Sequence, residues 1–273
     1  DISDIGGKGF NQSIAAARLG IKISFWSSLG SDNCKKRIIN TLEKEDISTK
    51  NITITKNKTD ESIIVVNEKG ENYIISSINN TQKIDLNYIK KMLSEIKEGE
   101  SLLLQGNLSK DITYKTIKLA FKNKIRIFLN ASPITYSYLK ILPYIDTLIV
   151  NETEIEQLTN FKNINIGNKY LLENGVKNII CTRGKKGIIY NSKNDTFTIK
   201  SPKVNTIDST GAGDVFCGSL VAFILKGFDF TRSCKNAIEL ASLSVTKHGT
   251  YLSIPSIEEI DTLNKQNNYK GAL

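Results

Sequence analysis

Residues 205–218, NTIDSTGAGDVFCG, decide the fold prediction together with the apolar run that follows them to Lys226. Small residues let a backbone approach a ligand closely, and a helix that begins here leaves unpaired N–H groups and the positive end of its dipole facing that ligand. Asp214 falls in the first turn, where the dipole favours an ionised carboxylate, so it could accept a proton from a substrate hydroxyl. The amides of Gly211–Gly213 would hold a phosphoryl group beside it. The alternative is that Asp214 only caps a buried helix after a glycine-rich turn.

The middle and C-terminal parts of the chain alternate between short β-branched runs and longer amphipathic runs. This alternation is typical of a parallel sheet with helices on both faces, so we predict an α/β architecture. The predicted strands are Ile21–Ser27, Ser101–Gln105, Arg126–Asn130, Thr147–Val150 and Asn178–Thr182. The predicted helices, which carry apolar residues three and four apart, are Asn33–Glu45, Asp85–Lys97, Ile112–Asn123 and Thr153–Leu158.

Residues 51–77 depart from this alternation. Two extended runs, Thr59–Asn67 and Glu71–Ser76, are joined by Glu68-Lys69-Gly70, whose glycine suits a positive φ. We predict a β-hairpin outside the main sheet; the alternative is an antiparallel edge of that sheet. Because no repeat or proline-rich linker marks a boundary, we expect one domain over residues 1–273.

A second glycine cluster, residues 6–12 (GGKGFNQ), precedes a predicted helix over Ser13–Leu19 that Gly20 ends. The cluster is not a P-loop, because G-x-x-x-x-G-K-[ST] occurs nowhere in the chain, and it lacks the third glycine and the preceding strand of a dinucleotide site. It offers Lys8, Asn11 and backbone amides to a polyhydroxylated or anionic ligand. The alternative is a simple helix N-terminus.

Residues 151–154 (NETE) follow the predicted strand Thr147–Val150. The i, i+3 spacing puts Asn151 and Glu154 on one side of a first helical turn, at the C-terminal end of the sheet. Such a pair suits a hydrated Mg²⁺ and its phosphates, because that ion keeps most of its waters. The alternative is a capping box, with Asn151 as the N-cap and Glu154 bonding back to it.

The composition excludes several classes of protein. Of 273 residues, 40% are hydrophobic and 24% are charged, which is typical of a globular chain rather than a disordered or fibrous one. No run approaches the roughly 18 apolar residues that span a bilayer, and residues 1–4 (DISD) lack the pattern of a secretion signal. We therefore expect a cytoplasmic protein with no membrane partner.

The cysteines and the histidine restrict the chemistry further. The four cysteines never approach a C-x-x-C spacing, which argues against a zinc ribbon or a redox pair and for free thiols. His248 is the only histidine, so a site with several histidine ligands is impossible. Catalysis would have to rest on carboxylates, backbone dipoles and cations.

The formal net charge of +9 could indicate a protein that binds nucleic acid. However, the lysines are scattered among asparagine and isoleucine along the chain, with no long basic run and no interleaved aromatic residues. We therefore expect no nucleic-acid partner, and at most a mild preference for anionic ligands such as nucleotides.

Taken together, these segments resemble the ribokinase-like, or PfkB, family of carbohydrate kinases. The resemblance rests, in chain order, on residues 6–20 (GGKGFNQSIAAARLG), 151–154 (NETE), 182–184 (TRG) with Gly187, and 208–214 (DSTGAGD). Within that family, the form Gly-Gly-Lys-Gly-x-Asn-Gln is most similar to the ribokinases. The resemblance implies a three-layer α/β/α sandwich with a mostly parallel sheet, and a small β lid that includes residues 51–77 and could form a homodimer contact.

The resemblance also implies a reaction and the residues for it. ATP would give its γ-phosphoryl group to a sugar hydroxyl, with Asp214 as the base. The implied anion hole consists of the amides of Gly211, Ala212 and Gly213. The implied sugar contacts are Gly7, Lys8 and Asn11. The residues implied near the nucleotide, Mg²⁺ and phosphates are Asn151, Glu154, Thr182, Gly184, Lys247 and Gly249, with Glu154 acting on Mg²⁺ indirectly. A monovalent cation, K⁺, would lie at Asp208 and Thr210.

Two features depart from the family pattern. The family has a first core strand and two lid strands before the Gly-Gly motif, roughly 30 residues. Only five residues precede Gly6, so we interpret the sequence as a fragment that lacks the sugar-binding Asp of that segment. In addition, Asn107 stands where ribokinases usually place a sugar-binding Glu. An amide can still bond a hydroxyl, so we predict that Asn107 contacts the sugar. Because its acceptor is neutral, the preference of the protein for one sugar over another could shift.

The leading hypothesis is an ATP-dependent sugar kinase that converts ribose to ribose 5-phosphate. One alternative is another ribokinase-like kinase, for a hexose, a sugar acid or a nucleoside. A second alternative is a truncated protein that binds a sugar or nucleotide without catalysis.

Overall fold

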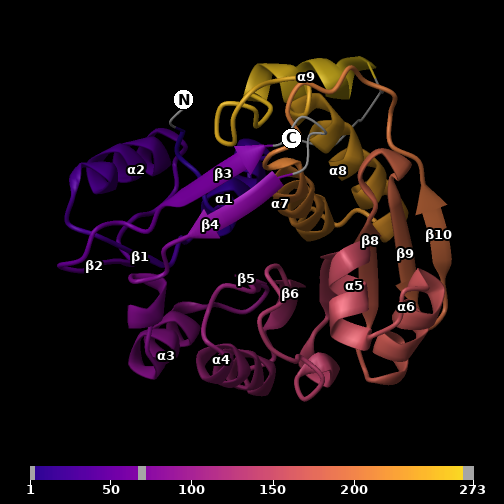
Figure 1. Ribbon diagram of the computed structural model, residues 1–273, viewed down its shortest axis with the longest axis horizontal. Helices are drawn as coiled ribbons and strands as arrows, with labels where there is room; N and C mark the ends of the chain where they lie inside the picture. The colour runs from indigo at the N-terminus through magenta and orange to yellow at the C-terminus, as the bar shows by residue number, and fades with distance from the viewer. Residues whose placement is uncertain (1–3, 67–71, 267–273) are drawn as a thin grey trace.

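The computed structural model describes residues 4–66 and 72–266, and within them the largest sheet has six strands (Figure 1). Their order is β10-β9-β8-β7-β6-β5. The bounds are β5 (Ser101–Gln105), β6 (Arg126–Asn130), β7 (Thr147–Asn151), β8 (Asn178–Thr182), β9 (Ile188–Ser192) and β10 (Thr196–Ile199). Strands β5 to β8 are parallel, whereas β9 and β10 are antiparallel to their neighbours, so the sheet is mostly parallel, as predicted.

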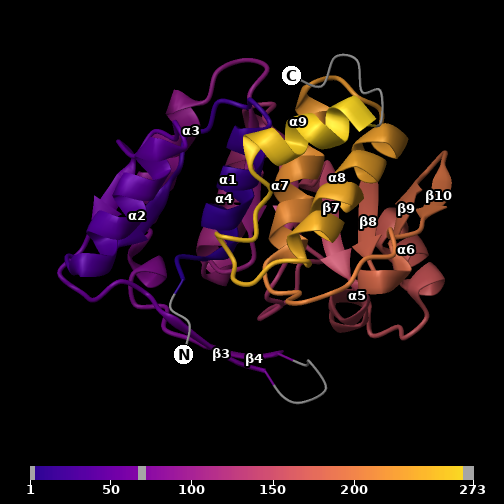
Figure 2. The ribbon, with the colours of Figure 1, turned by 90° about the horizontal axis from the view of Figure 1, so that it is seen from above.

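Helices cover both faces of this sheet (Figures 1 and 2). Their bounds are α1 (Lys8–Arg18), α2 (Asn33–Lys44), α3 (Leu86–Glu95), α4 (Lys110–Lys122), α5 (Glu152–Thr159), α6 (Ile164–Glu173), α7 (Ala212–Leu225), α8 (Phe230–Ser244) and α9 (Ile257–Gln266). Among the described residues, no helix is both long and apolar enough to cross a bilayer.

The side chains of the central strands alternate between two hydrophobic clusters. In β6, Ile127 and Leu129 pack in the cluster that includes α3, α4, α5 and α6, while Phe128 packs in the cluster that includes α7 and α8. All three side chains are buried. A parallel sheet must bury both faces in this way, so the predicted three-layer α/β/α arrangement is confirmed.

A third hydrophobic cluster joins α1 to α7. It contains Ile14 of α1 and Val215 of α7, together with residues of α2 and α9. Helices from opposite ends of the chain therefore lie side by side, and their packing brings the two glycine-rich segments together (Figure 2).

Two small sheets lie outside the main one. β1 (Ser27–Leu29) pairs in parallel with β2 (Ile52–Ile54), and β3 (Ser62–Val66) pairs antiparallel with β4 (Asn72–Ser76). The prediction of a hairpin separate from the main sheet is confirmed. Its predicted turn, Glu68–Gly70, lies outside the described residues.

Two predicted elements differ from the structure. The strand predicted over Ile21–Ser27 is wrong: only an isolated bridge, from Ser24 to Ser48, forms there, and β1 begins at Ser27. Its alternating apolar side chains pack against the α1–α7 cluster without a strand partner. The first helix begins at Lys8 rather than Ser13, because Gly7, with φ 115°, is its N-cap.

Candidate active site

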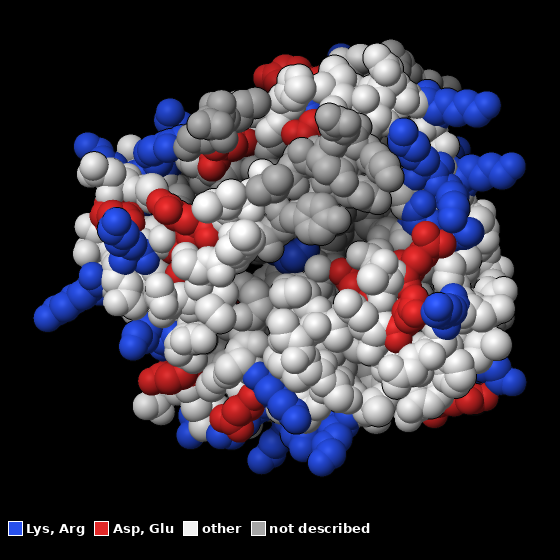
Figure 3. All heavy atoms as spheres, viewed as in Figure 1, with Lys and Arg blue, Asp and Glu red and all other residues white. Residues whose placement is uncertain are grey.

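A pocket of about 140 Å³ opens where the C-terminal ends of β6, β7 and β8 meet the first turns of α1 and α7. It is lined by Lys8, Asn130, Ser132, Ile149, Val150, Asn151, Glu154, Thr182, Gly211, Gly213 and Asp214. The ends of parallel strands are the usual ligand position in such a sheet. The face of the molecule drawn in Figure 3 has a hollow near its middle, where basic and acidic side chains come close to each other.

The N-terminus of α7 presents backbone N–H groups to this pocket. Gly211 is the N-cap with φ 81°, a left-handed conformation that favours glycine. Within the described part of the chain, the N–H groups of Gly211 and Gly213 make no hydrogen bond. The N–H of Ala212 donates to the Ser209 carbonyl at 3.3 Å, so Ala212 does not join them as a bare donor.

Asp214 lies in the first turn of α7, is 9% exposed and lines the pocket, as its predicted role requires. Each oxygen of its carboxylate accepts a hydrogen bond from α1. Asn11 Nδ2 donates to Oδ2 and Gln12 Nε2 donates to Oδ1, both at 3.0 Å. The two glycine-rich segments therefore form one site.

Asn11 retains an unused polar atom. Its side chain is 2% exposed, and its Oδ1 has no hydrogen-bond partner. A buried acceptor without a donor is costly. Asn11 is not among the residues that line the pocket, so its role as a sugar contact stays a prediction.

Lys8 lines the same pocket from the first turn of α1. Across residues 4–66 and 72–266 its ammonium group has no ion-pair or hydrogen-bond partner, so this group can bind an anion. Gly7 precedes it as the N-cap but is not among the lining residues.

Asn151 and Glu154 form the capping box that the sequence left as an alternative. Asn151 Oδ1 accepts from the Glu154 N–H at 2.8 Å, and Glu154 Oε2 accepts from the Asn151 N–H at 2.9 Å. These bonds use one oxygen of each side chain, and both residues line the pocket, so capping does not exclude a role toward a hydrated cation. In the described residues, no group of three or more His, Cys, Asp or Glu could hold a metal directly.

Asp208 joins two loops beside the pocket. Its Oδ1 accepts from the Thr210 N–H at 2.9 Å, and its Oδ2 accepts from the Gly249 N–H at 3.1 Å. Partial burial tends to raise the pKa of Asp208, but the hydrogen bonds from Thr210 and Gly249 outweigh it and hold the pKa below its ordinary value. Asp208 is therefore ionised at neutral pH. Its predicted role at a K⁺ site stays a prediction.

Several other predicted site residues do not line the pocket. Asn107 is exposed in the turn after β5, and Lys247 forms an ion pair with Glu259 at 2.5 Å. Gly184 lies in a short turn with φ 53°, where a Cβ would meet open space. Of the predicted nucleotide contacts beyond β7, only Thr182 reaches the pocket.

Sequence reasoning did not single out Gln12, Asn130 or Ser132. Gln12 is part of the glycine-rich cluster and lies four residues after Lys8. It therefore lies on the same face of α1, and this spacing is the signal that could have found it. Asn130 and Ser132 lie at and just beyond the end of β6, where a polar residue after a buried strand is a signal that could have found them.

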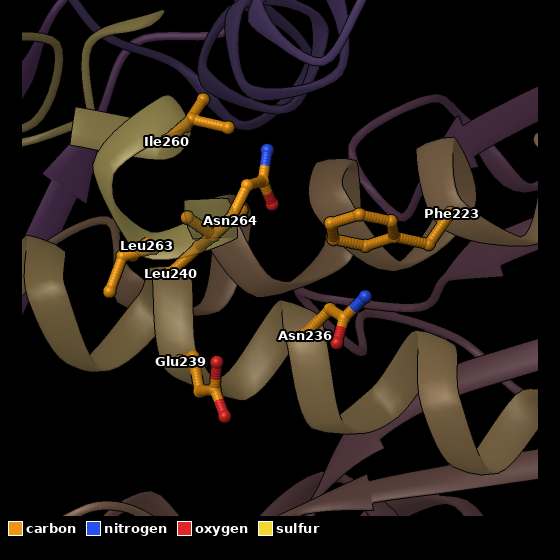
Figure 4. Close-up of a pocket in the computed structure, with 7 residues that line it drawn as sticks. All are labelled: Phe223, Asn236, Glu239, Leu240, Ile260, Leu263 and Asn264. Carbon is orange, nitrogen blue, oxygen red and sulfur yellow. The ribbon is translucent and has the colours of Figure 1, made fainter. Parts of the chain in front are cut away.

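A second, much smaller cavity lies between α7, α8 and α9 (Figure 4). It measures about 10 Å³ and is lined by Phe223, Asn236, Glu239, Leu240, Ile260, Leu263 and Asn264. Asn236 is 2% exposed, and neither polar atom of its side chain has a hydrogen-bond partner. The cavity has room for about one water molecule and is too small for a sugar.

Comparison with known proteins gives consistent matches. The model of the pfkB family of carbohydrate kinases matches residues 3–257. The chain is 31% identical to a ribokinase of Haemophilus influenzae, over 93% of this chain and 85% of that protein. It is 29% identical to a deoxyribokinase of Salmonella typhi, over 94% and 86% respectively.

Solved structures give the same result. A ribokinase from Thermotoga maritima aligns with a TM-score of 0.83 and 30% identity, over 95% of this chain and 87% of that one. An Arabidopsis thaliana ribokinase, solved with ribose and ATP, aligns with a TM-score of 0.84 and 24% identity over the same shares.

Proposed function

Because the chain belongs to the pfkB family of carbohydrate kinases, we propose that it transfers the γ-phosphoryl group of ATP to a hydroxyl of ribose. The family and the ribokinase-like fold that the sequence resembles are both confirmed. The chain is therefore a phosphotransferase that acts on a sugar hydroxyl. The observation that carries the proposed chemistry is Asp214, placed in one pocket with the unbonded N–H groups of Gly211 and Gly213.

These groups suit phosphoryl transfer, which needs positioning and charge stabilisation more than covalent chemistry. Asp214 accepts the proton of the sugar hydroxyl as that oxygen attacks phosphorus. The N–H groups of Gly211 and Gly213, at the positive end of the α7 dipole, receive the charge of the transferring phosphoryl group. The Lys8 ammonium adds a positive charge to the same pocket.

The groups that line the pocket suit the phosphates of a nucleotide with Mg²⁺. Glu154 and Asn151 lie together at the end of β7, and Lys8 has no counter-ion among the described residues. Mg²⁺ bound with the nucleotide supplies positive charge that neutralises the phosphates. Glu154 and Asn151 are the residues that would hold this hydrated ion. The K⁺ site at Asp208 and Thr210 remains part of the proposal and rests on the family resemblance.

The hairpin of β3 and β4 is the proposed lid. Ile63 and Ile75 are cross-strand partners, 64% and 69% exposed. An exposed apolar pair suits a surface that closes over a sugar or meets a second lid in a homodimer. We also propose that the chain forms one kinase domain with residues 51–77 as part of the lid, and that the protein is cytoplasmic.

The second candidate substrate is 2-deoxyribose, which the similarity to a deoxyribokinase favours. Ribose is preferred because the other similar proteins described above are ribokinases. Asn107, if it contacts the sugar, offers an amide instead of a carboxylate and would change the preference between sugars.

A coupled assay of ADP release tests the proposed function, with ribose, 2-deoxyribose, fructose and a nucleoside compared at equal concentration. We expect ATP-dependent turnover with the highest kcat/KM for ribose. A highest kcat/KM for another substrate would refute the ribose assignment. Binding of ATP and ribose in calorimetry without turnover would refute catalysis by this chain.

A further inference from the structure

Gln12 is a buried residue that contacts the Asp214 carboxylate. Its side chain is 0% exposed, and its Nε2 donates to Asp214 Oδ1 at 3.0 Å and to Asn130 Oδ1 at 3.2 Å. We propose that Gln12 is a positioning residue that fixes the orientation of the Asp214 carboxylate within the pocket. This inference rests on the proposed role of Asp214 as the base.

The amide of Gln12 can adopt only one orientation in this network. A carboxylate only accepts hydrogen bonds, so the NH₂ group of Gln12 must face Asp214. The opposite end of the amide is held as well, because Gln12 Oε1 accepts from Gln105 Nε2 at 2.9 Å. Asn130 is fixed in turn, since its Nδ2 donates to the Ile149 carbonyl at 3.2 Å. Gln12 is therefore held by β5 and β6 before any ligand binds.

The chain brings Gln12 to Asp214 through a close contact of two helices. Gly218 lies one turn after Asp214 on α7, and a Cβ at this position would come within 2.2 Å of the Gln12 carbonyl oxygen. Only a glycine permits this approach, so the backbone of Gln12 can lie next to the turn that carries Asp214.

The two oxygens of Asp214 are not equivalent in this arrangement. Oδ1 is bonded to Gln12, which is fully buried, whereas Oδ2 is bonded to Asn11, a predicted sugar contact with an unpartnered Oδ1. Both donors are buried, since Asn11 is 2% exposed and, like Gln12, is not among the residues that line the pocket. Both donors are neutral amides, which orient the carboxylate without adding charge to the pocket.

The first test replaces Gln12 by methionine, which keeps the size of the side chain and removes both donors. A lost hydrogen bond to a charged group predicts a fall in kcat of about 10- to 100-fold, with an unchanged KM for ATP. The matched control is Asn168→Ala. Asn168 is also buried, donates to Asn191 at 2.6 Å and does not line the pocket, so this variant should melt at a lower temperature with an unchanged kcat.

A second variant, Gln12→Glu, separates positioning from packing. The other charged groups that line this pocket are Lys8 and Glu154. At pH 8 a carboxylate at position 12 would repel Asp214, whereas a protonated one at lower pH could donate to it as the amide does. We expect the ratio of variant to wild-type kcat to rise at least threefold from pH 8 to pH 6.

The outcomes distinguish this inference from the proposed function. If the wild-type protein shows no sugar-dependent ADP release, both the proposed function and this inference are refuted. If the wild type turns over but Gln12→Met keeps its kcat within twofold, or the Gln12→Glu ratio stays constant with pH, only the positioning role is overturned.

Discussion

Replacing Gly218 by alanine should separate α1 from α7 at their closest contact. The new Cβ would lie 2.2 Å from the Gln12 carbonyl oxygen, and a real Cβ needs at least 3.0 Å, so the two backbones must move apart by about 0.8 Å. The hydrogen bonds from Asn11 and Gln12 to Asp214 are 3.0 Å long. The same movement lengthens them beyond hydrogen-bonding distance.

The magnitude follows from two opposing effects on stability and one effect on catalysis. Overpacking costs about 1–3 kcal/mol, and the better helix propensity of alanine returns about 1 kcal/mol. The net loss is up to about 2 kcal/mol, which lowers Tm by roughly 4–8 °C for a chain of this size. A displacement of nearly 1 Å at the proposed base predicts a fall in kcat of about 100-fold.

Thermal unfolding and the ADP-release assay measure the two effects on the same samples. The matched control is Gly167→Ala, because its Cβ would lie 2.4 Å from Ile155 Cγ2, a side-chain atom that can move, at the contact of α5 and α6. This control should keep its kcat within about twofold. A Gly218→Ala variant that melts lower but also keeps its kcat would refute the link between this helix contact and Asp214.

Two further predictions concern a cation and a pH dependence. Glu154→Gln should raise the Mg²⁺ concentration for half-maximal rate by about 10-fold. Its Tm should not fall, because Gln can still complete the capping box. An unchanged Mg²⁺ dependence would contradict the role of Glu154. A hydrogen bond from Thr59 holds the pKa of Asp32 below its unfolded value of 3.8, so Asp32 stabilises the fold above that pH and loses this effect as the pH falls. In urea unfolding, the advantage of wild type over Asp32→Asn should be constant above about pH 5 and shrink below about pH 4; an advantage that persists at low pH would contradict this sign.

The central strands were predictable because each is a short buried apolar run. The bounds of β5, β6 and β8 match the predicted ranges, since each apolar run has a polar residue at both ends. β6 and β8 are buried on both faces, whereas β5, at the edge of the described sheet, alternates between buried and half-buried residues. β9 and β10 were not predicted. They form an antiparallel edge in which only Ile188 and Tyr190 are buried, so their sequence lacks the continuous apolar run of a central strand.

The candidate site was predictable as two local motifs but not as one network. Residue types and spacing predicted Asp214, Asn11 and Lys8 as candidates, because a helix N-terminus after glycines has a known electrostatic property. Asp214 and Lys8 line one pocket, and Asn11 donates to Asp214. The bond between Gln12 and Asp214 joins residues 202 positions apart. It depends on how closely α1 and α7 pack, which no local pattern encodes. Asn107 shows the reverse case, since its position after a strand does not bring it to the pocket.

The most direct measurement compares Asp214→Asn with the wild type, in kcat with ribose and in the Kd for ATP by calorimetry. Asparagine keeps the shape of the side chain but cannot accept a proton at neutral pH, so kcat should fall at least about 100-fold while the Kd stays within about threefold. A variant with near-normal kcat would contradict the proposed base.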